Sequence, residues 1–358
     1  MSIPPRLTEY ICAFHIPLFF FLSGLLYKRR PFAEVLARRV RTLLVPYLLF
    51  SLIALVVRNV VLVDPHQGMA HYGRQLLGIA YGTVDGPYPL AVFPLWFLMS
   101  LFVAQVIFSC VLSISRQHTV RALVLVSLLA AIGFINSTTI RLAVPWSAAT
   151  SLVGLLFLAL GYWARQYVAG WTSLTSGANL TPIVLLASVV FLAASLNDPV
   201  IMGHDSYGSI PLFLVGAICG IGMILLLSVL LERLYHLAPP LSGAAAVAAR
   251  GRRAARAFIR SATACLTYLG RNALIILPMH VLAAALAAHW LAQMPPLSNP
   301  ILAEVIQKLL AGLILLASIE LLRRCPLIVP RKRVPAVVVA SQVHQPSGLP
   351  PGAPVPTS

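Results

Sequence analysis

The chain has 358 residues, of which 59% are hydrophobic and only 10% are charged, and its mean hydropathy is +0.90. A soluble core of this length does not need so much apolar material, so the composition excludes an ordinary soluble domain and indicates many membrane spans. The net charge of +17 does not indicate nucleic-acid binding, because the basic residues stand in short clusters between apolar runs. That arrangement is typical of membrane topology.

Nine apolar segments are long enough to cross a bilayer, which takes about 20 residues within a range of roughly 17 to 25. Each must be helical, because unpaired backbone polar groups cannot face lipid. We therefore predict an all-α polytopic membrane bundle of about nine transmembrane helices. The expected spans are 10–27, 43–63, 94–114, 120–136, 146–164, 179–196, 210–231, 272–291 and 301–322.

The basic residues predict the sides of the membrane. Alternate connections carry 21 of the 26 Lys and Arg residues, and the richest are 28–41, 232–271 and the C-terminal tail. In contrast, the connection 64–93 holds only Arg74 and the connection 197–209 holds none. Since the rich side of such a bias is cytoplasmic, we expect the N-terminus outside and the C-terminus inside.

Residues 1–325 form the expected membrane-embedded domain. Within it, the segment 232–271 is rich in arginine and alanine. That composition is consistent either with a basic amphipathic helix on the inner leaflet or with a flexible basic loop. The tail 326–358 is rich in proline, valine and glycine and is predicted to be disordered.

Polar residues inside the spans are candidate functional groups, because their burial in lipid costs several kcal/mol by some scales. His15 and His280 lie within apolar runs, and Arg58, Trp96 and Lys308 lie within or near the ends of other spans. Each also has an ordinary explanation. A histidine can hydrogen-bond to a neighbouring helix, Arg58 and Lys308 can extend to the lipid headgroups, and Trp96 can belong to an interfacial aromatic belt.

Arg38 and Arg41 are three residues apart and therefore share one face of a helix at the cytoplasmic start of the second span. They can act as topology signals and lipid-headgroup contacts, or they can have a functional role. The sequence holds no GxSxG, HExxH, Walker or GxGxxG motif. The five cysteines show no metal-ligand spacing, so we expect no metal site.

The run "FHIPLFFFLSGLLYKR" followed by "RRVRTLLVPYLLF" resembles the signature of the membrane acyltransferase family 3, and most of all its fucose 4-O-acetylase-like sugar O-acetyltransferases. The stretches "PLWFLMSLF", "FLALGYWAR" and "YLGRNALIILPMHVL" follow in the family's order, and the similarity covers about residues 10–325. Members are polytopic and transfer an acyl group from cytoplasmic acyl-CoA to an extracytoplasmic sugar, polysaccharide or antibiotic.

The resemblance implies roles for several residues. Arg38 and Arg41 match the family's Arg-x-x-Arg motif, which is implicated with acyl-CoA, and guanidinium groups bind phosphates well. Ser23 matches the small Ser-Gly pair and is expected near the donor, which would be acetyl-CoA. Trp96 and His280 match later family motifs.

We expect His15 and His280 to line one cavity as base or substrate-positioning groups. Arg58, Trp96 and Lys308 would meet the acceptor, a sugar, polysaccharide or lipid-linked glycan. The other expected contacts are membrane lipids, in a bacterial inner membrane, with no nucleic acid.

The chain departs from the family in one respect, because the helix that the resemblance places before residue 10 is not found in the sequence. The family's first helix carries the histidine with the strongest catalytic role, and this chain begins where the second helix is about to start. Either the start codon is assigned too late, or the protein is a shortened and inactive paralogue. The function has rivals of other classes, namely a membrane carrier of a sugar or small carboxylate and a non-catalytic scaffold.

Overall fold

The structure, a computed structural model, confirms the all-α membrane fold. Eight of the described helical runs are long and apolar enough to cross a membrane, and the described residues form no strand pairing beyond one isolated bridge between Ile201 and Ser206. The described residues are 5–62, 69–88, 93–116, 118–174, 180–236, 260–295 and 299–325.

The α-helices are α1 (Pro5–Cys12), α2 (His15–Leu25), α3 (Phe32–Arg39), α4 (Val45–Val57), α5 (Met69–Tyr81), α6 (Trp96–Ile114), α7 (Thr119–Ile135), α8 (Ala148–Leu174), α9 (Thr181–Leu196), α10 (Ile210–His236), α12 (Ala273–Ala292) and α13 (Pro300–Leu322). The short π-helices are η1 (Val40–Leu44), η2 (Arg58–Leu62) and η4 (Asn136–Ile140). The short 3₁₀ helices are η3 (Phe93–Leu95), η5 (Pro145–Ser147) and η6 (Met202–His204).

Most of the expected spans coincide with these helices, and the differences are local. The span expected at 179–196 is α9, which has 16 residues and is shorter than the other eight. The second span starts earlier than expected, because α3, η1, α4 and most of η2 form one helical run, Phe32–Val61. Helix α5 is an addition in the connection 64–93 that hydropathy did not indicate.

The structure describes the predicted cytoplasmic segment 232–271 only in part, and it does not describe the predicted tail 326–358. Residues 232–236 continue α10 and residues 260–271 are helical, but the rest of 232–271 lies outside the described residues. The tail 326–358 also lies outside them. The choice between an amphipathic helix and a loop, and the predicted disorder of the tail, therefore stay predictions.

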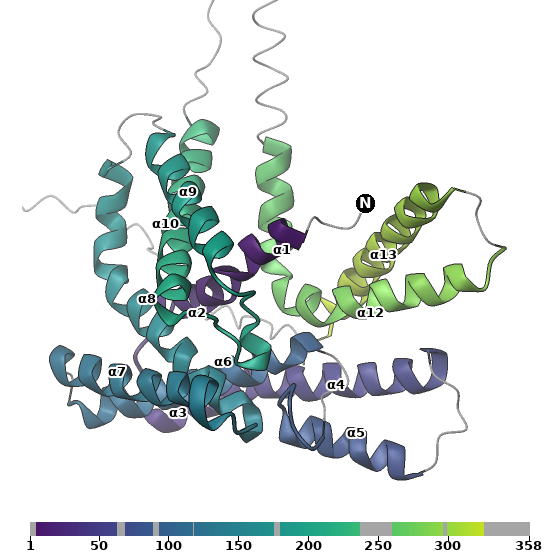
Figure 1. Cartoon of the computed structure of the whole chain (residues 1–358), viewed down its shortest axis with the longest axis horizontal. Helices are drawn as coiled ribbons and strands as arrows, with labels where there is room; N and C mark the ends of the chain where they lie inside the picture. Colours follow the sequence, from purple (N-terminus) through teal and green to yellow (C-terminus); the bar gives the residue numbers. More distant parts are fainter. Residues whose placement is uncertain are drawn as a thin grey trace, which may run out of the picture.

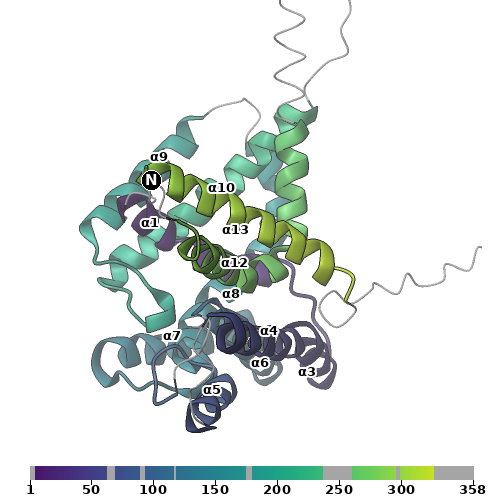
Figure 2. The ribbon, with the colours of Figure 1, turned by 90° about the vertical axis from the view of Figure 1, so that its right-hand side faces the viewer.

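The helices form two groups that cross steeply. Figure 1 shows α4, α6 and α7 lying along one direction beside α3 and α5, while α9 and α10 stand upright above them. Turned by 90°, α4 and α6 are seen nearly end-on (Figure 2). Helix α8 joins the groups, because it packs against α6 and α7 and also against α2, which in turn packs against α10.

Two glycines bring α2 and α8 into backbone contact. A Cβ atom on Gly24 would lie 1.9 Å from the carbonyl oxygen of Leu158, and one on Gly161 would lie 1.9 Å from that of Phe21. Small residues allow this close approach between membrane helices. The crossing fixes the position of α2, the helix that begins at His15.

The first turns of α2, α6 and α8 lie near the η6 turn, and all three helices lead away from it toward the contacts among Tyr27, Phe108 and Arg165. At the first end, the turn after α5 is tied to the segment before α8, since Thr83 Oγ1 donates to the carbonyl of Val144 at 2.8 Å and accepts from Ser147 N at 3.1 Å. At the other end, Arg165 of α8 donates to the carbonyl of Tyr27 at 3.3 Å. We call these the loop end and the arginine end.

The arginine end is built on an aromatic cluster. The Tyr27 ring packs edge-on against Phe108 of α6, with ring centroids 5.2 Å apart, and the Arg39 guanidinium lies 5.9 Å from the Tyr27 ring centroid. Such edge-to-face and cation–π contacts favour a fixed geometry. The C-terminal side of α2 is therefore anchored between α6 and α8.

Candidate functional site

A pocket at the N-terminal ends of α2 and α6 brings together three of the residues predicted from the sequence. His15, Trp96 and His280 all line it, and the η6 turn closes one side. The cavity volume is about 210 Å³. These three residues come from α2, α6 and α12, which are far apart along the chain. Packing of the helices, rather than any local motif, therefore creates the pocket.

His15 is the first residue of α2, directly after the break that separates this helix from α1. Its ring Nδ1 lies 3.0 Å from the carbonyl oxygen of Ile11. A carbonyl oxygen can only accept a hydrogen bond, so Nδ1 carries the hydrogen and Nε2 carries a lone pair. No described residue forms a hydrogen bond with this Nε2.

His280 repeats the arrangement on α12. Its Nδ1 lies 3.0 Å from the carbonyl oxygen of Ile276, one helical turn earlier, and among the described residues its Nε2 has no hydrogen-bond partner. Both imidazoles of the pocket are thus held in the tautomer whose Nε2 can accept a proton. The pocket can supply a general base, which is the chemistry that acyl transfer to a hydroxyl requires.

Trp96 forms part of the apolar wall. Its side chain is only 3% exposed, so it does not face a lipid–water interface as a belt residue would. The ring packs edge-on against Phe97, which also lines the pocket. An apolar wall beside two imidazoles provides space for a small acyl chain or for the apolar face of a sugar ring.

Arg38 and Arg41 lie at the arginine end, away from this pocket. Both are exposed, Arg38 in the last turn of α3 and Arg41 in η1, and both elements pack on α6. Phe108, which packs on Tyr27 at that end, is about 18 Å along α6 from Trp96 at 1.5 Å per residue. A tunnel that joins the arginine pair to the histidines stays a prediction.

Arg39, which was not predicted as a site residue from the sequence, is more deeply placed than Arg38 and Arg41. It is half-buried beside Tyr27, and its Nε atom is buried with no hydrogen-bond partner among the described residues. The signal available in the sequence was its place between Arg38 and Arg41 in the same basic cluster.

Three other predicted residues are not brought to the histidines. Ser23 is half-buried on α2, and Arg58 is exposed at the end of α4. Lys308 pairs with Glu304 of the same helix at 2.8 Å, and its side chain is 56% exposed. None of the three lines the histidine pocket, so their contacts with donor or acceptor stay predictions.

A second pocket, of about 420 Å³, adjoins the first at Gly203, which lines both. On its wall, Nδ1 of His204 lies 2.8 Å from each carboxylate oxygen of Asp85. This pair was not predicted from the sequence, because the two residues are 119 positions apart and lie in connections between spans. One feature of the sequence did point to this pair, since the connections 64–93 and 197–209 are both expected on the same side of the membrane. No group of three His, Cys, Asp or Glu side chains suited to a metal occurs in the described part of the chain.

The fold and the pocket define a polytopic helical membrane protein in which two histidines line one pocket. The sequence model described as an acyltransferase domain, that of acyltransferase family 3, matches residues 1–317. The chain therefore belongs to acyltransferase family 3 and is a membrane acyltransferase. No curated protein and no solved structure matches the chain.

Proposed function

We propose that this protein transfers an acyl group, most simply acetyl, from cytoplasmic acyl-CoA to a hydroxyl of an extracytoplasmic sugar. The acceptor would be a polysaccharide or a lipid-linked glycan at a bacterial inner membrane. The observation that carries this proposal is the pair His15 and His280, which line one pocket with Nε2 available to accept a proton. A positioned histidine base typically accelerates such a step about 10²–10⁴-fold.

The chemical step needs one of these imidazoles and no redox group. The acceptor oxygen attacks the thioester carbonyl while an Nε2 takes the hydroxyl proton, and a C–O bond forms. The C–S bond then breaks, and the proton passes from the imidazole to the leaving thiolate. The second imidazole would hold the acceptor hydroxyl by a hydrogen bond. The apolar side chains of Trp96 and Phe97 would exclude water, which otherwise competes as the acceptor.

The donor would bind from the arginine end. CoA carries several phosphate oxygens, and guanidinium groups hold phosphates through charge-assisted, often bidentate hydrogen bonds. Arg38 and Arg41 are exposed there, and the neighbouring Arg39 adds a third positive charge. Because α2, α6 and α8 run from this end to the loop end, donor and acceptor would approach the histidine pocket from opposite ends.

The test is acetyl transfer by the full-length protein in membrane vesicles, with labelled acetyl-CoA and a carbohydrate extract as acceptor. We expect His15→Ala and His280→Ala each to lower the rate, by about 10²–10⁴-fold for whichever histidine is the base. His289→Ala is the matched control, because His289 lies on α12 like His280 but is half-buried outside the pocket, next to Gln293.

The amount of folded protein in the membrane is measured for every variant. If His15→Ala and His280→Ala are folded and transfer acetyl at the wild-type rate, the histidine pocket is not the acyl-transfer site. A protein that binds no acetyl-CoA would instead favour the carrier or the scaffold.

A further inference from the structure

The larger pocket at the loop end is built from three separate connections. Thr83 and Asp85 come from the turn after α5, Arg141 from the connection between η4 and η5, and His204 and Asp205 from η6 and the residue after it. Its volume of about 420 Å³ falls in the range of roughly 300–1,000 Å³ typical of small-molecule sites. The described walls are mostly polar, unlike those of the histidine pocket.

Side-chain hydrogen bonds hold these walls in place. Asn136 donates to the carbonyl of Leu142 at 3.1 Å and accepts from the same residue's N–H at 3.2 Å. Asp205 accepts a hydrogen bond from Thr150 Oγ1 at 2.5 Å, which ties the η6 turn to α8. A pocket whose walls are fixed before binding loses less entropy when a ligand enters.

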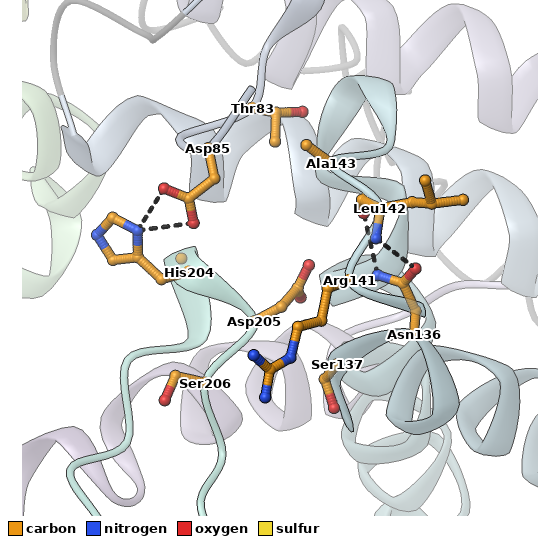
Figure 3. A pocket seen from close by; sticks show the side chains of 11 residues that line it. Thr83, Asp85, Asn136, Ser137, Arg141, Leu142, Ala143, His204, Asp205 and Ser206 are labelled. Carbon is orange, nitrogen blue, oxygen red and sulfur yellow. Dashed lines mark hydrogen bonds and ion pairs between the residues drawn. The ribbon is translucent and has the colours of Figure 1, made fainter. Parts of the chain in front are cut away.

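Two different polar groups face each other across the pocket, an Asp–His pair and an arginine, and the Asp205 carboxyl lies beside the arginine. Figure 3 shows the Asp85–His204 pair on one side and the Arg141 side chain extending between Ser137 and Ser206 on the other. No described residue forms an ion pair or side-chain hydrogen bond with the Arg141 guanidinium.

Arg141 also has a left-handed backbone, with φ of 54°. Such a conformation costs about 1–3 kcal/mol in a residue other than glycine and often accompanies a functional role.

We propose that this pocket binds a sugar that carries an acidic group. Arg141 would bind the carboxylate or phosphate of that sugar, since guanidinium groups pair with both. Asp85 would accept hydrogen bonds from the ring hydroxyls, with its carboxylate oriented by His204. Thr83 Oγ1 lines the same cavity, and because its hydrogen is donated to the carbonyl of Val144, it would act there as an acceptor for a ring hydroxyl.

The position of the pocket links it to acyl transfer, and in this respect the inference rests on the proposed function. Gly203 lines both cavities, so a sugar held at the loop end lies beside the pocket of His15 and His280. An acidic group held at Arg141 would fix the orientation of the sugar ring. That orientation would decide which hydroxyl reaches the histidine pocket and is acylated.

The experiment measures ligand binding to the purified full-length protein without any acyl donor, by the shift in its melting temperature. The carboxylate probes are D-glucuronate and D-galacturonate, and the phosphate probes are D-glucose 6-phosphate and D-galactose 6-phosphate. The neutral probes are D-glucose and D-galactose. We expect the uronates, the sugar 6-phosphates or both to bind at least tenfold more tightly than the neutral sugar with the same ring configuration. Comparison of the uronates with the 6-phosphates tells whether Arg141 accepts a carboxylate or a phosphate.

Arg141→Gln should abolish this preference, because glutamine keeps the backbone strain but removes the charge. Arg74→Gln is the matched control, since Arg74 is exposed on α5 and does not line the pocket. The inference is overturned if wild type shows no preference for acidic sugars, or if Arg141→Gln keeps it. Because no donor is present, a loss of binding here and a failure of acetyl transfer are separate results.

Discussion

Asp205 shows how one residue of the loop end responds to pH. Its carboxylate accepts hydrogen bonds from Thr150 Oγ1 at 2.5 Å and from the Tyr207 hydroxyl at 3.3 Å. Burial nevertheless raises the pKa of Asp205, because removal of solvent disfavours the charged form more than these two donors favour it. The folded protein therefore holds this proton more tightly than the unfolded chain does.

The sign of the resulting pH dependence follows from linkage. A raised folded-state pKa gives stability that is present below the unfolded pKa of about 3.9 and is lost as the pH rises through the folded value. Asp205→Asn, which keeps an acceptor oxygen, should therefore melt at a higher temperature than wild type at pH 7.5. Melting curves between pH 7.5 and 4.5 should show this advantage shrinking as the pH falls. A gap that stays constant with pH would mean that ionisation of Asp205 does not limit stability.

The sequence identified individual site residues only where a polar or aromatic side chain stood inside an apolar, membrane-spanning run. His15, His280 and Trp96 stood out because polar or aromatic groups in apolar runs need a reason, and the structure places all three in one pocket. Asp85 and Arg141 lie in connections, where charged residues are ordinary. Only three-dimensional proximity distinguishes them, and spacing along the chain does not encode it.

The contact between α2 and α8 depends on glycine at two positions. A methyl group added at Gly161 would lie 1.9 Å from the carbonyl oxygen of Phe21, and the atoms in the way are backbone rather than a flexible side chain. Gly161→Ala should therefore push α2 away and destabilise the protein by at least the roughly 1–3 kcal/mol typical of overpacking. We expect a lower melting temperature and less folded protein in the membrane.

Gly312→Ala is the control for this substitution. Gly312 also lies in a membrane helix, α13, but a Cβ atom there would meet nothing within 4 Å. Alanine favours helix over glycine by roughly 0.5–1 kcal/mol, so this variant should be neutral or slightly more stable. Equal behaviour of the two variants would show that α2 and α8 do not touch at Gly161.

Hydropathy predicted which segments form helices, but it did not predict their irregularities. An apolar run must be helical in lipid, and that argument located the expected spans close to the observed helices. The π-helix η1 and the separate helix α5 carry no such signal, because each depends on packing against neighbours such as α6 and α4. The bend between α1 and α2, which places His15 at a helix start, was equally invisible to a hydropathy argument.

The molecule as a whole has two chemically different ends. The connections that the basic-residue bias assigned to one side of the membrane meet at the loop end, through bonds such as Tyr81 Oη to the carbonyl of Ala143 at 2.5 Å. Arg39 and Arg165 gather around Tyr27 at the arginine end. For these connections, the basic-residue bias and the three-dimensional grouping divide the chain in the same way.

This division predicts the orientation in a membrane. Because 21 of the 26 basic residues fall in connections assigned to one side, that side should be cytoplasmic and the loop end should face outward. Ser206→Cys, exposed at the loop end, should react with a membrane-impermeant maleimide in intact cells. His118→Cys, exposed between α6 and α7 at the arginine end, should react only after the cells are permeabilised. The wild-type chain with its five free cysteines gives the baseline. The reverse pattern would place the acidic-sugar pocket inside the cell and would contradict an extracytoplasmic acceptor.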